Sequence, residues 1–303
     1  MLAKVKAENK DIGERALLCA CILHALSESG HVDEAWKLLE ESPGSVRVME
    51  IGMLFQTDKL PLETLLTRLR ELTDPDDRTN AIRAILSSRS ASIAQLDFNT
   101  FPLESESDQR AAFGAFVSVL HGAAGEKDVA TSEAVLGKLV DLVGTGKIDG
   151  KHLYVVLDGD YGVDPFRKWE MLRPVEGGMS PADSERFRVQ GVTSMVRADM
   201  DKAMELLCSD PQSRYSVPIL NKAISTIYQL DPAHANKWMT ENLSRIDPAT
   251  GQRVIVSVGQ AAIRSGELAT ARQWAEHLLN PGVKEQLLKQ IDAAEVPAAD
   301  GSR

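Results

Sequence analysis

Apolar residues recur every three or four positions along most of the chain, which is the period of an amphipathic helix. Helix-start signals divide this pattern: Asp-Pro occurs five times, and Asn280-Pro281 is a sixth case of the same kind. Asp or Asn accepts hydrogen bonds from the free N–H groups of a first turn, where proline is tolerated. We therefore expect an all-α chain with helices near residues 12–29, 34–42, 45–56, 61–72, 75–87, 108–121, 129–143, 181–197, 199–208, 217–229, 232–244, 248–264, 267–279 and 282–293.

One short pattern occurs three times in the C-terminal part of the chain. In each copy a large apolar residue follows an alanine by three positions, as in Ala203 and Leu206, Ala235 and Trp238, and Ala271 and Trp274. The alanines are 32 and 36 positions apart. A period in the middle thirties, with a small residue where two helices touch, is typical of stacked helical hairpins. The two tryptophans are expected to pack between helices.

A further hairpin is predicted over residues 12–42, with its turn at Gly30 and a helix cap at Asp33. Trp36 is offset from the later tryptophans, so we expect it to be partly exposed. The expected apolar stripe of the first helix consists of Leu17, Leu18, Cys21, Ile22 and Ala25.

The segment ALLCACILHALSESGHVDEAWKLLEE (16–41) resembles one tetratricopeptide or pentatricopeptide hairpin, and RVIVSVGQAAIRSGELATARQWAEHLL (253–279) resembles the same unit. The resemblance covers residues 12–42 and about 190–292, without the full Trp/Leu-Gly/Tyr/Pro pattern of the family. The chain is also similar to loosely repetitive helical proteins of some bacterial lineages. These likenesses imply an α-solenoid of stacked antiparallel helical hairpins, and they imply no particular ligand.

The segment 144–180 breaks the rhythm and is expected to be an irregular central insertion, with a helical turn at Tyr154–Leu157. Such a connection is either functional or a seam between subdomains, and both interpretations remain open. The predicted division is an N-terminal subdomain at 1–175 that includes the irregular segment 144–175, a C-terminal subdomain at 176–296 and a disordered tail at 297–303.

Composition narrows the choice of partner and compartment. The formal charge is −10, from 34 basic and 44 acidic residues, which argues against DNA and RNA because phosphate binding needs a basic surface. No apolar run approaches the ~20 residues of a membrane span. Cys19, Cys21 and Cys208 form no disulfide framework, so we expect reduced, buried thiols in a cytoplasmic protein. Residues 16–26 have the length of a signal-peptide core, but acidic residues precede them, and a buried helix is the favoured interpretation.

The chemical motifs are incomplete. Cys19, Cys21 and His24 lack a second ligand pair at zinc-like spacing. Asp158, Asp160 and Asp164 fit three positions of a calcium loop, but Val163 and Trp169 stand where that loop needs glycine and glutamate. No phosphate loop or nucleophile motif is present. The sequence therefore predicts no catalytic residue, metal or cofactor.

Trp169 lies outside the repeats and is the first candidate for a binding aromatic, although it could instead fill a seam between the two halves. Its candidate companions in a basic-aromatic patch are Arg167, Lys168, Arg173 and Tyr161. The leading hypothesis is a non-enzymatic module that binds a protein, a peptide or a second copy of itself. The alternatives are an RNA-binding repeat protein and an enzyme with its site in 144–180, around Asp158, Asp160 and Asp164.

Overall fold

The computed structural model describes residues 12–40, 44–57, 60–209 and 217–295, and these contain α-helices and short 3-10 helices but no strand. The predicted all-α class is therefore confirmed for the described part. The chain divides into two compact units, one formed by Met1–His152 and Gly159–Gly178, the other by Leu153–Asp158 and Met179–Arg303.

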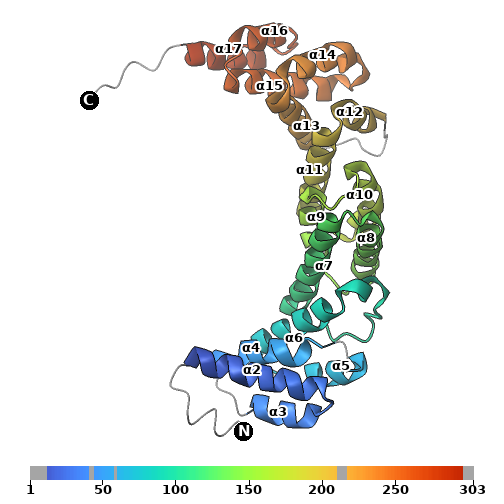
Figure 1. Ribbon diagram of the computed structural model, residues 1–303. Helices are drawn as coiled ribbons and strands as arrows, with labels where there is room; N and C mark the ends of the chain where they lie inside the picture. Colours follow the sequence, from blue (N-terminus) through green and yellow to red (C-terminus); the bar gives the residue numbers. More distant parts are fainter. Residues whose placement is uncertain (1–11, 41–43, 58–59, 210–216, 296–303) are drawn as a thin grey trace, which may run out of the picture. The chain divides into compact units, whose positions relative to one another are not determined.

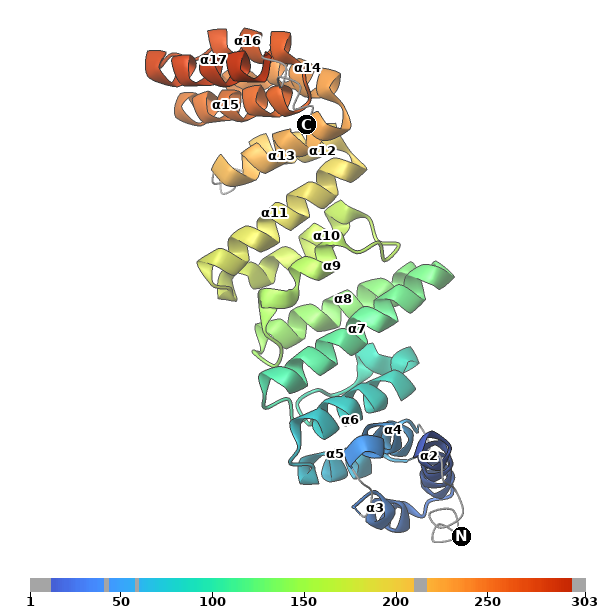
Figure 2. The ribbon, with the colours of Figure 1, turned by 90° about the vertical axis from the view of Figure 1, so that its left-hand side faces the viewer.

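Unit 1 contains inner helices that follow one another and outer elements packed beside them. The inner helices α2, α4, α6 and α7 pack in that order, and Figure 2 shows α4, α6 and α7 as successive rungs. The outer elements α3, α5, η1 and α8 pack against them, and Figure 1 shows α5 and α8 on the same side of α6 and α7. The elements are α2 (Ile12–Glu28), α3 (Val32–Glu40), α4 (Gly44–Phe55), α5 (Leu62–Glu71), α6 (Pro75–Ser88), η1 (Ser90–Gln95), α7 (Glu106–Glu126), α8 (Val129–Gly144), η2 (Gly150–His152), α10 (Pro165–Leu172) and η3 (Arg173–Gly178).

Unit 2 has a similar arrangement: α11 packs on α13, α13 on α15 and α15 on α17, and α12, α14 and α16 pack beside them. The small residues Ala203, Ala235 and Ala271 are buried, as are Trp238 and Trp274, which confirms their predicted packing. The Trp274 indole N–H donates to Asn236 Oδ1 at 2.7 Å. The elements are α9 (Tyr154–Asp158), α11 (Pro181–Ala198), α12 (Met200–Ser209), α13 (Val217–Leu230), α14 (Pro232–Asn242), η5 (Leu243–Arg245), α15 (Pro248–Arg264), α16 (Leu268–Glu276) and α17 (Pro281–Glu295).

The helices begin where the Asp-Pro signals predict them. Asp74, Asp164, Asp231 and Asp247 each accept backbone N–H hydrogen bonds at the start of a helix. Asn280 accepts from the backbone of Gly282 and Val283 in the same way. The remaining case, Asp210-Pro211, lies outside the described residues.

Equivalent residues of the inner helices in unit 1 recur every 31 positions. Arg47, Arg78 and Gln109 are each the fourth residue of their helix, and they are 31 positions apart. Arg47 Nε donates to Asp77 Oδ2 at 2.6 Å, and Arg78 Nη2 donates to Asp108 Oδ2 at 2.9 Å. Both aspartates are the buried third residue of the next inner helix. The links therefore set one inner helix parallel to the next.

The apolar stripe predicted for the first helix is wrong. Leu17 and Leu18 are 51% and 42% exposed, and Cys21 and Ala25 are exposed as well. The buried face of α2 consists of Cys19, Ala20, Leu23 and Ser27. The α2 helix carries apolar residues on all of its faces, so their spacing does not determine which face is buried. Packing against α4 determines it, and the Ser27 hydroxyl donates to Leu54 O at 3.2 Å across that contact.

Two other expectations also change. Trp36 is buried rather than partly exposed, because its ring packs edge-on against Phe55 with centroids 6.1 Å apart and the Arg68 guanidinium lies 5.2 Å from its centroid. Of the thiols expected to be buried, Cys19 is buried and Cys21 is exposed, while the Cys208 side chain lies outside the description.

The segment 144–180 is built largely of short helical elements rather than irregular chain. It contains η2, α9, α10 and η3, and the predicted helical turn at Tyr154–Leu157 is confirmed by α9. The expected boundary lay near residue 175. In the structure, Leu153–Asp158 belongs to unit 2 and the chain returns to unit 1 until Gly178.

We predict that Arg78→Met lowers the free energy of unfolding by about 3 kcal/mol at neutral pH, because it leaves the Asp108 carboxylate buried without its cation. Burial alone would raise the pKa of Asp108, but the hydrogen bonds from Arg78 and Ser105 and the charge of Arg78 outweigh it and lower the pKa. The stabilisation is thus present above the unfolded pKa near 3.8 and is lost as the pH falls through the lower folded value. Urea unfolding at pH 7 and at pH 3 measures both effects.

Arg110→Met is the matched control, because Arg110 pairs with Glu106 on an exposed helix face. It should leave the urea midpoint unchanged. Equal effects of the two substitutions, or a cost of Arg78→Met that does not shrink in acid, would contradict the buried link.

Candidate functional site

The predicted basic-aromatic patch is not a surface in the structure. Trp169, Tyr161 and Lys168 are 4%, 1% and 2% exposed. Lys168 Nζ donates to Gly159 O at 2.5 Å and lies 5.5 Å from the Tyr161 ring centroid. The ammonium group therefore interacts with groups inside unit 1. Arg167 is exposed but pairs with Glu133, and Arg173 is half-buried.

The reason is the short helix α10, which packs against α8. Phe166, Trp169 and Leu172 follow one another at intervals of three, and all three are buried. The helical spacing that places these side chains together also makes Trp169 a core residue. As a correction to the sequence-based hypothesis, Trp169 is not available to stack on a ligand in this structure.

The three aspartates proposed as an enzymatic core each have a different partner. Asp164 caps α10, and Asp160 Oδ1 accepts from the Gly162 backbone at 3.1 Å. Asp158 Oδ1 accepts from Gln190 Nε2 at 2.6 Å. Among the described residues, no group of three or more His, Cys, Asp or Glu side chains is arranged to hold a metal ion.

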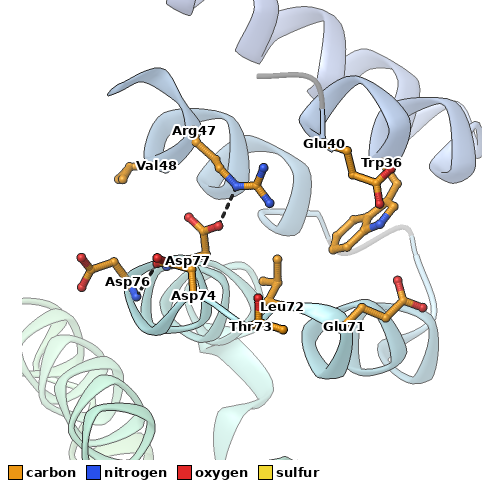
Figure 3. A pocket seen from close by; sticks show the side chains of 10 residues that line it. All are labelled: Trp36, Glu40, Arg47, Val48, Glu71, Leu72, Thr73, Asp74, Asp76 and Asp77. Carbon is orange, nitrogen blue, oxygen red and sulfur yellow. Dashed lines mark hydrogen bonds and ion pairs between the residues drawn. The ribbon is translucent and has the colours of Figure 1, made fainter. Parts of the chain in front are cut away.

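A pocket of about 670 Å³ in unit 1 lies where the ends of α3 and α5 meet the starts of α4 and α6 (Figure 3). Trp36 stands at one side of it, and Arg47 reaches from α4 toward Asp77 on α6. Five carboxylates face one guanidinium. The lining residues are Trp36, Glu40, Arg47, Val48, Glu71, Leu72, Thr73, Asp74, Asp76 and Asp77.

Most of these carboxylates already form ion pairs or hydrogen bonds within unit 1. Asp77 binds Arg47, and Asp74 accepts from the backbone of Asp76 and Asp77 at 2.9 and 3.0 Å. Glu71 pairs with Arg68 at 2.8 Å. Of the five carboxylates that line the pocket, those of Glu40 and Asp76 have no such partner among the described residues. The pocket is therefore first a junction between successive hairpins, and chemically it offers negative charge beside an aromatic wall.

A second surface follows from the 31-residue period. Side chains that point away from the internal packing recur at equivalent positions of α2, α4, α6 and α7, and we call this surface the inner row. It consists of Leu17, Leu18, Cys21 and Ala25 on α2; Val48, Met49 and Gly52 on α4, with Gln56 directly after this helix; Thr79, Asn80, Arg83 and Ser87 on α6; and Arg110, Gly114 and Ser118 on α7.

The first half of the inner row is apolar. Val48 and Met49 are 50% and 46% exposed, and they lie 31 positions after the exposed Leu17 and Leu18. The helices α2 and α4 that carry these residues pack against each other. The sequence pattern did not reveal the row, because the exposed apolar residues of α2 were expected in the core. The 31-residue steps from Arg47 to Arg78 and from Asp77 to Asp108 were the signal that could have revealed it.

Comparison of the chain with protein-family models, with curated proteins and with solved structures gives no significant match. Geometry alone therefore carries the functional inference. Among the helices of the described ranges, none combines the length and the apolar character needed to cross a bilayer.

We predict that the native tryptophan emission is blue-shifted and poorly quenched by iodide, because all four indoles, Trp169 included, are less than a tenth exposed. Trp169→Phe should remove intensity without removing a quenchable component, and unfolding in urea should restore quenching as a positive control. A readily quenched component in the wild type that Trp169→Phe abolishes would contradict the burial of Trp169.

Proposed function

We propose that the chain is a non-enzymatic α-solenoid of tetratricopeptide-like helical hairpins that holds a protein or peptide partner. Two features support the solenoid: each inner helix packs on the next one along the chain, and Arg47 and Arg78 make equivalent links one period apart. In such stacks, repeat-equivalent exposed side chains form an extended binding surface.

The observation that carries the proposal is the apolar half of the inner row. Eight large hydrophobic side chains are exposed among the described residues, and half of them are Leu17, Leu18, Val48 and Met49. Single exposed hydrophobic residues are ordinary, but a group on two neighbouring helices indicates an interaction site. Internal packing leaves 42% to 51% of each of these four residues exposed, and binding of a partner would bury this remaining apolar surface.

The same surface argues for protein over RNA. Reading RNA requires basic and base-stacking residues at successive repeats, whereas the row begins with apolar side chains and none of the members named above is aromatic. The exposed Cys21 thiol is in keeping with a reducing compartment such as the cytoplasm.

The test is affinity capture from the source cells with the full chain and with the double variant Leu18→Glu/Met49→Glu. We expect a specific protein to be recovered with the wild type and reduced at least ten-fold with the variant, because two carboxylates would have to be buried in the interface. Val129→Glu, at an exposed apolar position outside the inner row, is the matched control. Equal recovery with all three proteins would contradict a binding role for the row.

A further inference from the structure

The inner row changes from apolar to polar and basic residues at α6, and this change indicates which kind of partner would fit it. Arg83 takes the position that Cys21 has on α2 and Gly52 has on α4, 31 positions apart in each step. Its side chain is exposed, and the described residues provide no ion-pair partner for it. A surface that runs from four aliphatic side chains to an unpaired guanidinium is complementary to a segment that runs from apolar to acidic residues.

Resting on the function proposed above, we infer that the inner row binds an amphipathic helix of a partner protein, whose apolar side chains lie on α2 and α4 and whose carboxylates meet Arg83. Helices that pack side by side are about 8–10 Å apart, so α2 and α6 are separated by roughly 20 Å along the row. A partner helix of about 12 to 14 residues spans that distance.

The surface beyond Arg83 determines where along the row the acidic groups of a partner would lie. One turn further along α6, Ser87 borders a hollow of about 580 Å³ that small residues of α7, including Ser118 and Gly122, also line. Glu126 and Asp128 also line this hollow. These two carboxylates repel acidic groups, so the partner's carboxylates are favoured at Arg83 and disfavoured past it.

The probes for this inference are two fluorescein-labelled helical peptides of 14 residues. Both have leucines along one face, and they differ only in flanking glutamates or flanking lysines. With the full chain at low salt, fluorescence polarisation should show the glutamate peptide binding at least ten-fold more tightly. Arg83→Glu should remove or invert this preference, and Met49→Glu should weaken both peptides.

Arg264→Glu is the matched charge control, because Arg264 is exposed on α15, a helix of unit 2 that is not part of the inner row. It should leave the preference unchanged, and circular dichroism with thermal unfolding should confirm that each variant is folded. Equal binding of the two peptides, no binding of either, or equal effects of Arg83→Glu and Arg264→Glu would overturn the inference. Sedimentation showing self-association that Met49→Glu abolishes would overturn it too, since the occupant would then be a second copy.

The two proposals fail in different ways. If the captured native partner depends on Leu18 and Met49 while the glutamate peptide shows no advantage, the partner chemistry is wrong and the scaffold function stands. If capture and peptide binding are both indifferent to these residues, both proposals fail.

Discussion

The arrangement of unit 1 depends on one interaction, the buried arginine–aspartate link between successive inner helices. Arg78 binds the Asp108 carboxylate and also lies within hydrogen-bond distance of the Leu69, Leu72 and Pro102 carbonyl oxygens. A buried carboxylate is costly unless a cation and hydrogen bonds satisfy it, so the pairing defines the register of α6 on α7. Arg47 does the same between α4 and α6, and it also holds the Leu39 carbonyl at the end of α3.

The rest of the surface follows from this register. Because the inner helices step forward by a constant number of residues, side chains that point away from the packing come together in rows. Where such a row contains Leu17, Leu18, Val48 and Met49, it forms an apolar surface that internal packing leaves about half exposed. The Trp36 pocket lies at the opposite extreme, since most of its carboxylates already serve the junction between hairpins.

The starts of helices could be predicted from the sequence, but which face of a helix is buried could not. An Asp-Pro pair caps a helix through hydrogen bonds to its own neighbours, so the helix starts after Asp74, Asp231 and Asp247 could be predicted. The buried alanines of unit 2 could be predicted from their period. The exposed face of α2 could not, because a helix that is apolar all round takes its orientation from tertiary packing.

The error at Trp169 has the same physical origin. An aromatic residue beside Arg167 and Lys168 reads as a binding patch in one dimension, yet Lys168 points inward because Gly159 supplies a carbonyl acceptor. That acceptor is nine positions away and could not be assigned from spacing. The 31-residue period was present in the sequence, but only the structure shows that the arginine at the fourth position of one inner helix binds the aspartate at the third position of the next.

Deletion of residues 74–104, which is one period, tests this account most directly. It places Asp108 where Asp77 stood, so Arg47 gains an equivalent partner. We expect a helical protein with a cooperative urea transition that Arg47→Met shifts to lower urea concentration, whereas deletion of residues 74–100 breaks the register and loses cooperativity. A one-period deletion that unfolds without a cooperative transition, or that is insensitive to Arg47→Met, would contradict the repeated link.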